Sequence, residues 1–139
     1  MSKFKLEPDY NYDFFLMALC CHEKDYRICW AINNILNTDL RKEKDLNIPQ
    51  KKGNAASLFS LYFYNDEEQF REYYLVSNKN ETSVLIPEQK QADYFMLVKG
   101  TLGSNEKEQM LLKIKGSGMV LTAYTVEPGS LRSKQNLIF

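Results

Sequence analysis

The sequence contains few of the residues that disulfide-rich, metal-binding and membrane proteins need. It has three cysteines, one histidine and no run of about 18 apolar residues, and residues 1–9 lack the apolar stretch of a signal peptide. Cys20 and Cys21 are adjacent, so an odd thiol is left over and no disulfide framework is expected. We therefore expect a cytoplasmic protein with no membrane span, no metal and no cofactor.

An excess of charge of one sign is also missing. The 18 Lys and Arg residues balance 18 Asp and Glu residues, so the formal net charge is zero, whereas proteins that bind nucleic acid carry a basic surface. The tyrosine-rich runs 58–64 and 70–77 would suit stacking of RNA bases, but Glu67, Glu68 and Glu72 flank them. Nucleic acid is therefore not an expected partner.

The length and the apolar content predict one domain. The chain has 139 residues, of which 44% are hydrophobic, with one tryptophan, nine tyrosines and eight phenylalanines. A chain of this length can bury about two thirds of its surface and has the apolar residues for a core. We expect a single domain over 1–139.

The pattern of apolar residues predicts alternating strands and helices. A helix over 23–37 is favoured because its apolar residues, spaced about 100° apart per residue, form one stripe of roughly 120°. A second helix begins near Asn105, where Glu108 has the spacing of a capping box. The expected strands cover 12–20, 58–64, 70–77, 83–86, 93–99 and 119–126.

Two segments do not fit this periodicity. Residues 38–56 have little apolar pattern and predict a long mobile connection. Residues 129–139 end in an apolar run, so we expect this tail to dock on the rest of the domain.

The order β-α-β-β-β-β-α-β predicts an α+β fold. Right-handed crossovers would place both helices on one face of a mostly antiparallel sheet, as a two-layer sandwich. This order resembles the ferredoxin-like fold with one or two extra strands.

The only cluster with metal-binding or nucleophilic side chains is Cys20, Cys21 and His22. Adjacent side chains of a strand face opposite sides, so the three cannot all reach one ion. Cys21 precedes a predicted helix, whose N-terminus would favour a thiolate, which leaves cysteine catalysis open as an alternative to simple packing.

The segment between the strand over 93–99 and the second helix offers an anion site. Gly100, Gly103, Ser104 and Asn105 would leave free backbone N–H groups at a helix N-terminus. An ordinary capped connection is the alternative.

The first helix carries a stripe that a core does not require. Tyr26, Trp30, Asn33 and Asn37 share an arc of roughly 60° beside the apolar arc. Aromatic and amide groups aligned in this way favour a partner surface or a small polar pocket. The alternative is that they form the amphipathic margin of the helix and pack under the 38–56 segment.

The segment Ile86-Pro87-Glu88 followed by Asp93-Tyr94 resembles the motif of the bacterial IPExxxDY family. The resemblance also includes 25–30 with Arg27 and Trp30, Asn33, 77–79 and 131–139, but four residues separate Glu88 from Asp93, one more than the family's name contains. It implies no activity, cofactor or catalytic residue, and it makes Arg27, Glu88, Asp93 and Tyr94 candidate interaction residues.

These observations favour a non-catalytic interaction or regulatory module that self-associates as a dimer, or binds a protein partner, through a sheet edge or an aromatic face. The first alternative is a domain that senses a small ligand or anion, as ferredoxin-like regulatory domains do. The second is an enzyme that uses Glu88 and Asp93 as acid and base.

Overall fold

The computed structural model describes residues 13–49, 57–137 and 139. In these residues, no helix is long and apolar enough to cross a membrane. The expected strand residue 12 and positions 50–56 of the expected connection lie outside the described part. The elements are β1 (Phe15–Cys20), α1 (Asp25–Leu36), β2 (Arg41–Lys42), β3 (Leu46–Ile48), β4 (Ser57–Phe59), β5 (Leu61–Asp66), β6 (Arg71–Ser77), β7 (Tyr94–Lys99), α2 (Ser104–Lys115) and β8 (Thr122–Val126).

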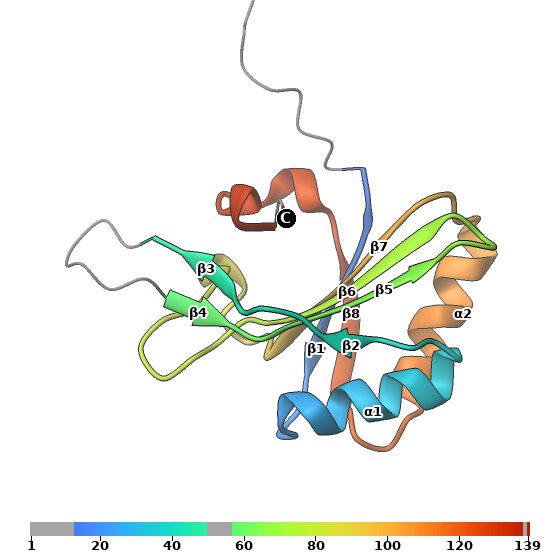
Figure 1. Ribbon diagram of the computed structural model, residues 1–139, viewed down its shortest axis with the longest axis horizontal. Coiled ribbons are helices and arrows are strands. Elements are labelled where there is room, and N and C mark those ends of the chain that lie inside the picture. Colours follow the sequence, from blue (N-terminus) through green and yellow to red (C-terminus); the bar gives the residue numbers. More distant parts are fainter. Residues whose placement is uncertain (1–12, 50–56, 138) are drawn as a thin grey trace, which may run out of the picture.

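Six strands form one antiparallel sheet in the order β2-β5-β6-β7-β1-β8, and β3 pairs with β4 separately (Figure 1). The elements β1, α1, β6, β7, α2 and β8 follow one another as βαββαβ, the ferredoxin-like pattern. The extra strands β2 to β5 lie between α1 and β6 in the chain. The predicted α+β class with a mostly antiparallel sheet is confirmed.

Both helices cover the same face of the sheet, because their apolar stripes enter one core. Ile28 and Ile32 of α1 and Ile114 of α2 pack with Met17 of β1 and Met96 of β7. All five side chains are buried. Short helices depend on such tertiary packing for their stability, so this core positions both of them.

The opposite face of the sheet is covered by segments that contain no long helix or strand. The side chains of Leu16 and Leu97 on this face form a second core with Ile86, Leu131 and Leu137. Figure 1 shows the C-terminal coil, in red, above the sheet and away from α1. The C-terminal segment thus supplies core residues to the second face.

The segment expected to be a long connection contains short strands that the sequence did not predict. β2 and β3 have two and three residues, too few to show a period, and Leu40 beside β2 is buried. The expected strand over 58–64 is divided, because β4 pairs with β3 and β5 pairs with β6.

Three predicted details were wrong for local reasons. Residues 83–86 form no strand, because Val84 forms only an isolated bridge to Lys79. Ser83 bonds to Asn80, and the N–H groups of Leu85 and Ile86 donate to Asn78. The last strand begins at Thr122 and not at 119. The α2 cap lies two residues earlier than predicted, since the N–H of Gly103 donates to Oε1 of Glu106 at 3.0 Å.

Candidate functional site

The motif residues 86–93 lie in the connection between β6 and β7, and Tyr94 begins β7. The two carboxylates of the motif contact different parts of the chain. Glu88 accepts hydrogen bonds from Ser133, in the C-terminal segment. Asp93 accepts hydrogen bonds from the turn after β1 and from Lys79. The structure therefore gives the two carboxylates separate structural contacts.

Glu88 fixes the C-terminal segment against the connection. Its carboxylate oxygens lie 2.5 Å from the N of Ser133 and 2.9 Å from the Oγ of Ser133. Burial would raise the pKa of Glu88, but the Ser133 bonds and the nearby Arg132 outweigh it and hold the pKa below its ordinary value. The ionised carboxylate is thus the form that holds the segment.

Asp93 fixes the turn between β1 and α1. Oδ2 accepts the N–H of Cys21 at 2.9 Å, and Oδ1 lies 3.1 Å from Nζ of Lys79. The Asp93 backbone continues the sheet, because its N–H donates to the carbonyl of Leu19 at 2.8 Å. This carboxylate therefore links three segments that are distant in the sequence.

Asn78 is the buried centre of the connection, and sequence reasoning assigned it no role beyond its place in the family resemblance. Its side chain is fully buried, and Nδ2 donates to the carbonyls of Gln89 and Ala92, each at 2.9 Å. Oδ1 accepts the N–H of Ile86 at 2.8 Å. One amide thus satisfies three backbone groups that no strand ladder pairs.

Tyr94, the last motif residue, is a core residue. Its ring belongs to the core under the helices, and its hydroxyl donates to the carbonyl of Glu23 at 2.7 Å. Burial, with nearby Cys21 and Asp25 as lesser causes, raises the pKa of Tyr94 far above its ordinary value. The Tyr94 side chain is thus a neutral hydrogen-bond donor that holds the segment before α1 in place.

A small polar cavity of about 260 Å³ lies beside Asp93. Cys21 and His22 line it together with Lys79 and Tyr94, but Glu88 does not. Burial raises the pKa of Cys20 and of Cys21, and the carboxylate of Asp93 raises both further. These thiols are therefore held in the protonated, weakly nucleophilic form, contrary to what an activated cysteine requires. No group of three or more His, Cys, Asp or Glu residues in the described part of the chain could hold a metal ion.

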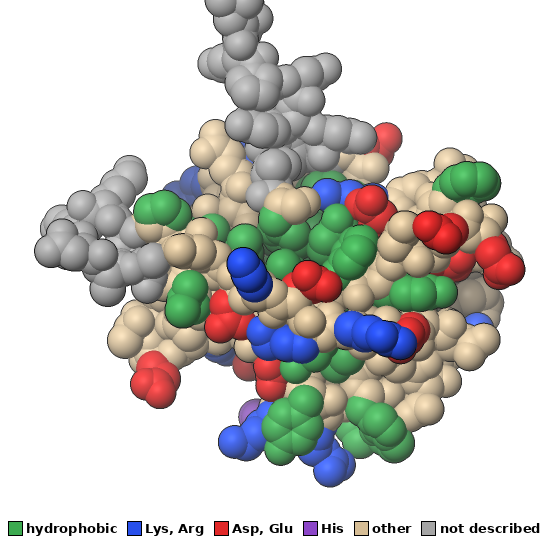
Figure 2. Space-filling view, in the orientation of Figure 1, with side chains coloured by type: hydrophobic (Ala, Val, Ile, Leu, Met, Phe, Trp, Pro, Cys, Tyr) green, Lys and Arg blue, Asp and Glu red, His purple; other side chains and the backbone are tan. Residues whose placement is uncertain are grey.

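The exposed face of α1 presents two large aromatic side chains. Tyr26 is 60% exposed and Trp30 is 63% exposed, and together with Arg27 they line a surface hollow of about 440 Å³. Figure 2 shows hydrophobic side chains gathered over α1 at the bottom of the molecule, with Lys and Arg side chains beside them. We call Tyr26, Arg27 and Trp30 the α1 face.

Asn33, predicted to belong to this surface, instead anchors the end of α1. Its Oδ1 accepts the N–H of Leu40 and the hydroxyl of Thr38, each at 2.8 Å. Its Nδ2 donates to the carbonyl of Leu40 at 3.1 Å. These bonds hold the chain as it turns from α1 to β2.

The predicted anion loop already contains a carboxylate of its own. The Gly103 N–H is taken by Glu106, and the same carboxylate lies 2.6 Å from Nη2 of Arg71. Gly100 has a φ of 127°, and a Cβ there would lie 2.7 Å from the carbonyl oxygen of Phe70. Gly100 is thus required by the close approach of the β5–β6 turn.

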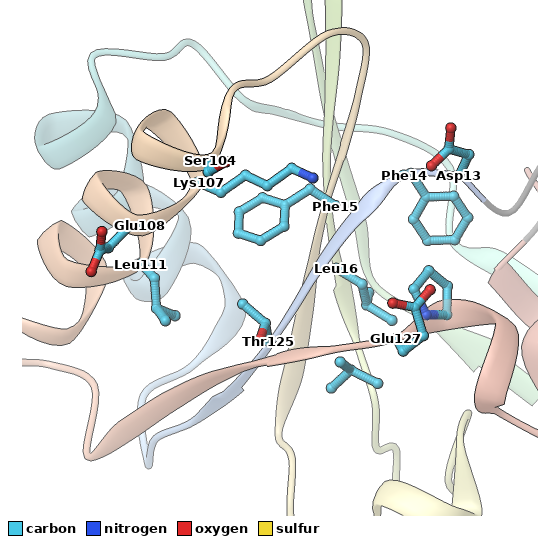
Figure 3. Close-up of a pocket in the computed structure, with 12 residues that line it drawn as sticks. Asp13, Phe14, Phe15, Leu16, Ser104, Lys107, Glu108, Leu111, Thr125 and Glu127 are labelled. Carbon is cyan, nitrogen blue, oxygen red and sulfur yellow. The ribbon is translucent and has the colours of Figure 1, made fainter.

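A larger groove of about 720 Å³ lies between the start of β1, α2 and the end of β8. No sequence pattern indicates this groove, because three elements that are distant in the chain form it. Figure 3 shows Phe15, Lys107, Leu111 and Thr125 directed into this region from β1, α2 and β8. Its charged lining is acidic overall, with three carboxylates against one ammonium group, from Asp13, Glu108, Glu127 and Lys107. Of the four residues predicted to form an anion site, Gly100, Gly103, Ser104 and Asn105, only Ser104 lines this groove.

Comparison with protein-family models, curated proteins and solved structures finds no match to this chain.

Proposed function

We propose that the protein is a non-catalytic interaction or regulatory module whose α1 face binds a protein partner. The observation that carries this proposal is the exposure of Trp30, the only tryptophan of the chain, beside an equally exposed Tyr26. Trp, Tyr and Arg are the residues most often found at the energetic centre of protein interfaces, and Arg27 completes the set. The underside of α1 is buried, so the face is held on a rigid element.

The charges around the α1 face favour an acidic partner surface. Lys24 and Arg27 contribute exposed positive charges, and Glu23 offsets one of them through a contact of 3.2 Å to Arg27. The carboxylate of Asp25 is half-buried and accepts the hydroxyl of Tyr62, so it is directed away from this face. The complementary partner is a protein with an apolar pocket rimmed by carboxylates. Such a rim would attract Lys24 and Arg27 while the pocket covers Trp30.

The contacts of the motif support a non-catalytic role. Glu88 and Asp93 are engaged with Ser133, Cys21 and Lys79, and the thiols of Cys20 and Cys21 are stabilised in their neutral form. Each of these groups has a structural contact that explains its position. The aromatic side chains of the α1 face have no such explanation.

Crosslinking followed by titration tests the proposal. A photoreactive amino acid at position 26 identifies the protein that covers the α1 face, and that protein is then purified. Trp30 is the only tryptophan of this chain, so a partner without tryptophan should shift the fluorescence emission of Trp30 to shorter wavelength when it binds, and the titration gives the affinity. For a partner that contains tryptophan, calorimetry measures the affinity instead.

The variants Trp30→Ala and Arg27→Glu should each weaken that affinity at least tenfold, which is about 1.4 kcal/mol, without changing the circular dichroism spectrum. Phe70→Ala is the matched control, because Phe70 is an exposed aromatic residue in the turn between β5 and β6. Equal binding by the wild type and by the double variant Tyr26→Ala, Trp30→Ala would overturn the proposal.

A second candidate function is the binding of a small ligand in the groove between β1, α2 and β8. Its volume of about 720 Å³ is within the range of ligand sites. The excess of carboxylates in its lining favours a cationic or neutral ligand over an anion. A thermal-shift screen tests it, since a ligand that binds only the folded state raises the melting temperature.

Two further proposals concern kinship and location. The chain resembles the bacterial IPExxxDY family in Ile86-Pro87-Glu88 and Asp93-Tyr94, and the contacts of Glu88 and Asp93 give that motif a structural reason. The three cysteines are free, which supports a reducing, cytoplasmic compartment.

A further inference from the structure

The strand β8 ends the six-stranded sheet at one edge. It pairs with β1 on its inner side, and no other strand in the described part of the chain lies beyond it. In an antiparallel ladder, alternate residues direct their N–H and C=O groups to the opposite side, so β8 presents backbone donors and acceptors outward. Such an edge is a template for another strand.

The two edges of this sheet differ in how they are protected. The edge strand β2 has only two residues, Arg41 and Lys42, and both are charged and exposed, which is a usual way of preventing strand addition. By contrast, the run from Val120 to Val126 has no charge, no proline and no glycine. It combines β-branched and aromatic residues, which favour pairing.

The side of α2 next to this edge carries a self-complementary charge pattern. Lys107, Glu108 and Leu111 line the groove beside β8, and the exposed Leu112 and Lys115 follow them on the helix. The ammonium group of Lys107 is directed at Phe15, 5.7 Å from the centre of its ring. Apart from Lys107, this side has Glu108 toward the start of the helix and Lys115 toward its end, with leucines between. A helix with this pattern complements an antiparallel copy of itself.

We propose that β8 pairs antiparallel with β8 of a second copy of this chain, around a two-fold axis near Tyr124, which joins the two sheets edge to edge. This inference does not depend on the proposed function of the α1 face. In this arrangement Thr122 of one copy lies opposite Val126 of the other, so no like charges meet across the pair. The two α2 helices run antiparallel on one face, with Glu108 of each toward Lys115 of the other.

The oligomeric mass of the full chain tests the proposal. Light scattering coupled to size exclusion should give twice the chain mass for the wild type over a range of concentrations. Thr122→Lys places a charge on the exposed edge and should reduce the mass to that of one chain. Thr101→Lys is the matched control, because Thr101 is exposed in the loop before α2, and its mass should equal that of the wild type.

A charge swap on α2 separates the proposed pairing from any other dimer. Glu108→Lys alone and Lys115→Glu alone should each raise the dimer dissociation constant about tenfold by placing like charges opposite each other. The double variant Glu108→Lys, Lys115→Glu should restore the wild-type constant. Melting temperatures measured in parallel distinguish a variant that is less stably folded from a variant that has only lost the pairing.

Each remaining result contradicts the proposal. A wild type that has the mass of one chain at every concentration overturns it. A dimer that survives Thr122→Lys, or that the double charge swap fails to restore, overturns the β8 pairing. The backbone N–H groups of β8 could instead become protected from hydrogen exchange only when an unrelated extended peptide is added. That result would assign the β8 edge to a peptide partner and not to a second copy of the chain.

Discussion

Glu88 accepts two hydrogen bonds from Ser133, one from the backbone N–H at 2.5 Å and one from the hydroxyl at 2.9 Å, across 45 residues of sequence. Nearby, Nδ2 of Asn136 donates to the carbonyl of Leu85 at 2.9 Å. These bonds hold the segment that contributes Leu131 and Leu137 to the second core. The connection between β6 and β7 and the C-terminal segment thus support each other over one face of the sheet.

Replacing Glu88 with Ala should therefore reduce the free energy of unfolding by about 2 kcal/mol, because hydrogen bonds to a charged group contribute about 1.5–3 kcal/mol and the Ser133 N–H loses its acceptor. Urea unfolding measures the change. Ser133→Ala should cost less than Glu88→Ala, since the N–H bond remains, and the double variant should cost less than the sum. Glu81→Ala, at an exposed position, is the control and should change the stability by less than about 0.5 kcal/mol. Additive costs at 88 and 133 would contradict a direct interaction.

The Glu88 interaction should also depend on pH in one direction. The pKa of Glu88 is lower in the folded state than its ordinary value of about 4.3. Its stabilisation is therefore present above the ordinary pKa and is lost as the pH falls through the lower, folded-state pKa. The difference in unfolding free energy between the wild type and Glu88→Gln should be constant from pH 7 to about pH 5 and should shrink toward pH 2. A difference that grows as the pH falls would refute this assignment.

Asn78 should be one of the most sensitive polar positions of the chain. Asn78→Ala leaves the Ile86 N–H and the carbonyls of Gln89 and Ala92 without partners in a buried site, so we expect a loss of about 3 kcal/mol or more. Asn80→Ala is the matched control, because Asn80 caps a more exposed turn next to it, and it should cost about 1 kcal/mol. Chemical denaturation measures both. Equal losses would show that burial of Asn78 is not the cause.

The elements with a clear period were predictable, and those held by single side chains were not. The helix over 23–37 and the strand over 93–99 had apolar patterns long enough to read, because each buries one face or both in the sheet core. The connection over 78–93 follows no period. Its backbone groups bond to the side chain of Asn78, a tertiary contact that composition and spacing do not encode.

Among the candidate surface residues of α1, the exposed ones were also predictable from helical spacing, and the one that bonds to another segment was not. Tyr26 and Trp30 were predictable as a surface because their helical positions lie outside the apolar stripe, and both are exposed. Asn33 lies on the same stripe but bonds to Leu40, because α1 ends there and the chain returns over it. Whether a polar residue at a helix margin faces solvent or the next segment depends on the path of the chain, which helical spacing does not show.

The thiols provide a prediction that separates packing from catalysis. Burial, with Asp25 and Asp39 as lesser causes, raises the pKa of Cys29 to about 11, and the pKa values of Cys20 and Cys21 are raised as well. At pH 8 the thiolate fraction of Cys29 is then on the order of one in a thousand, against roughly a quarter for a free thiol. Labelling with iodoacetamide, read by mass spectrometry, should therefore be at least a hundredfold slower at Cys29 in the native protein than in 8 M urea. Cys20, which is partly exposed, should react first among the three. Rapid native labelling of Cys21 at pH 7 would instead indicate an activated nucleophile beside His22 and would favour the enzyme alternative.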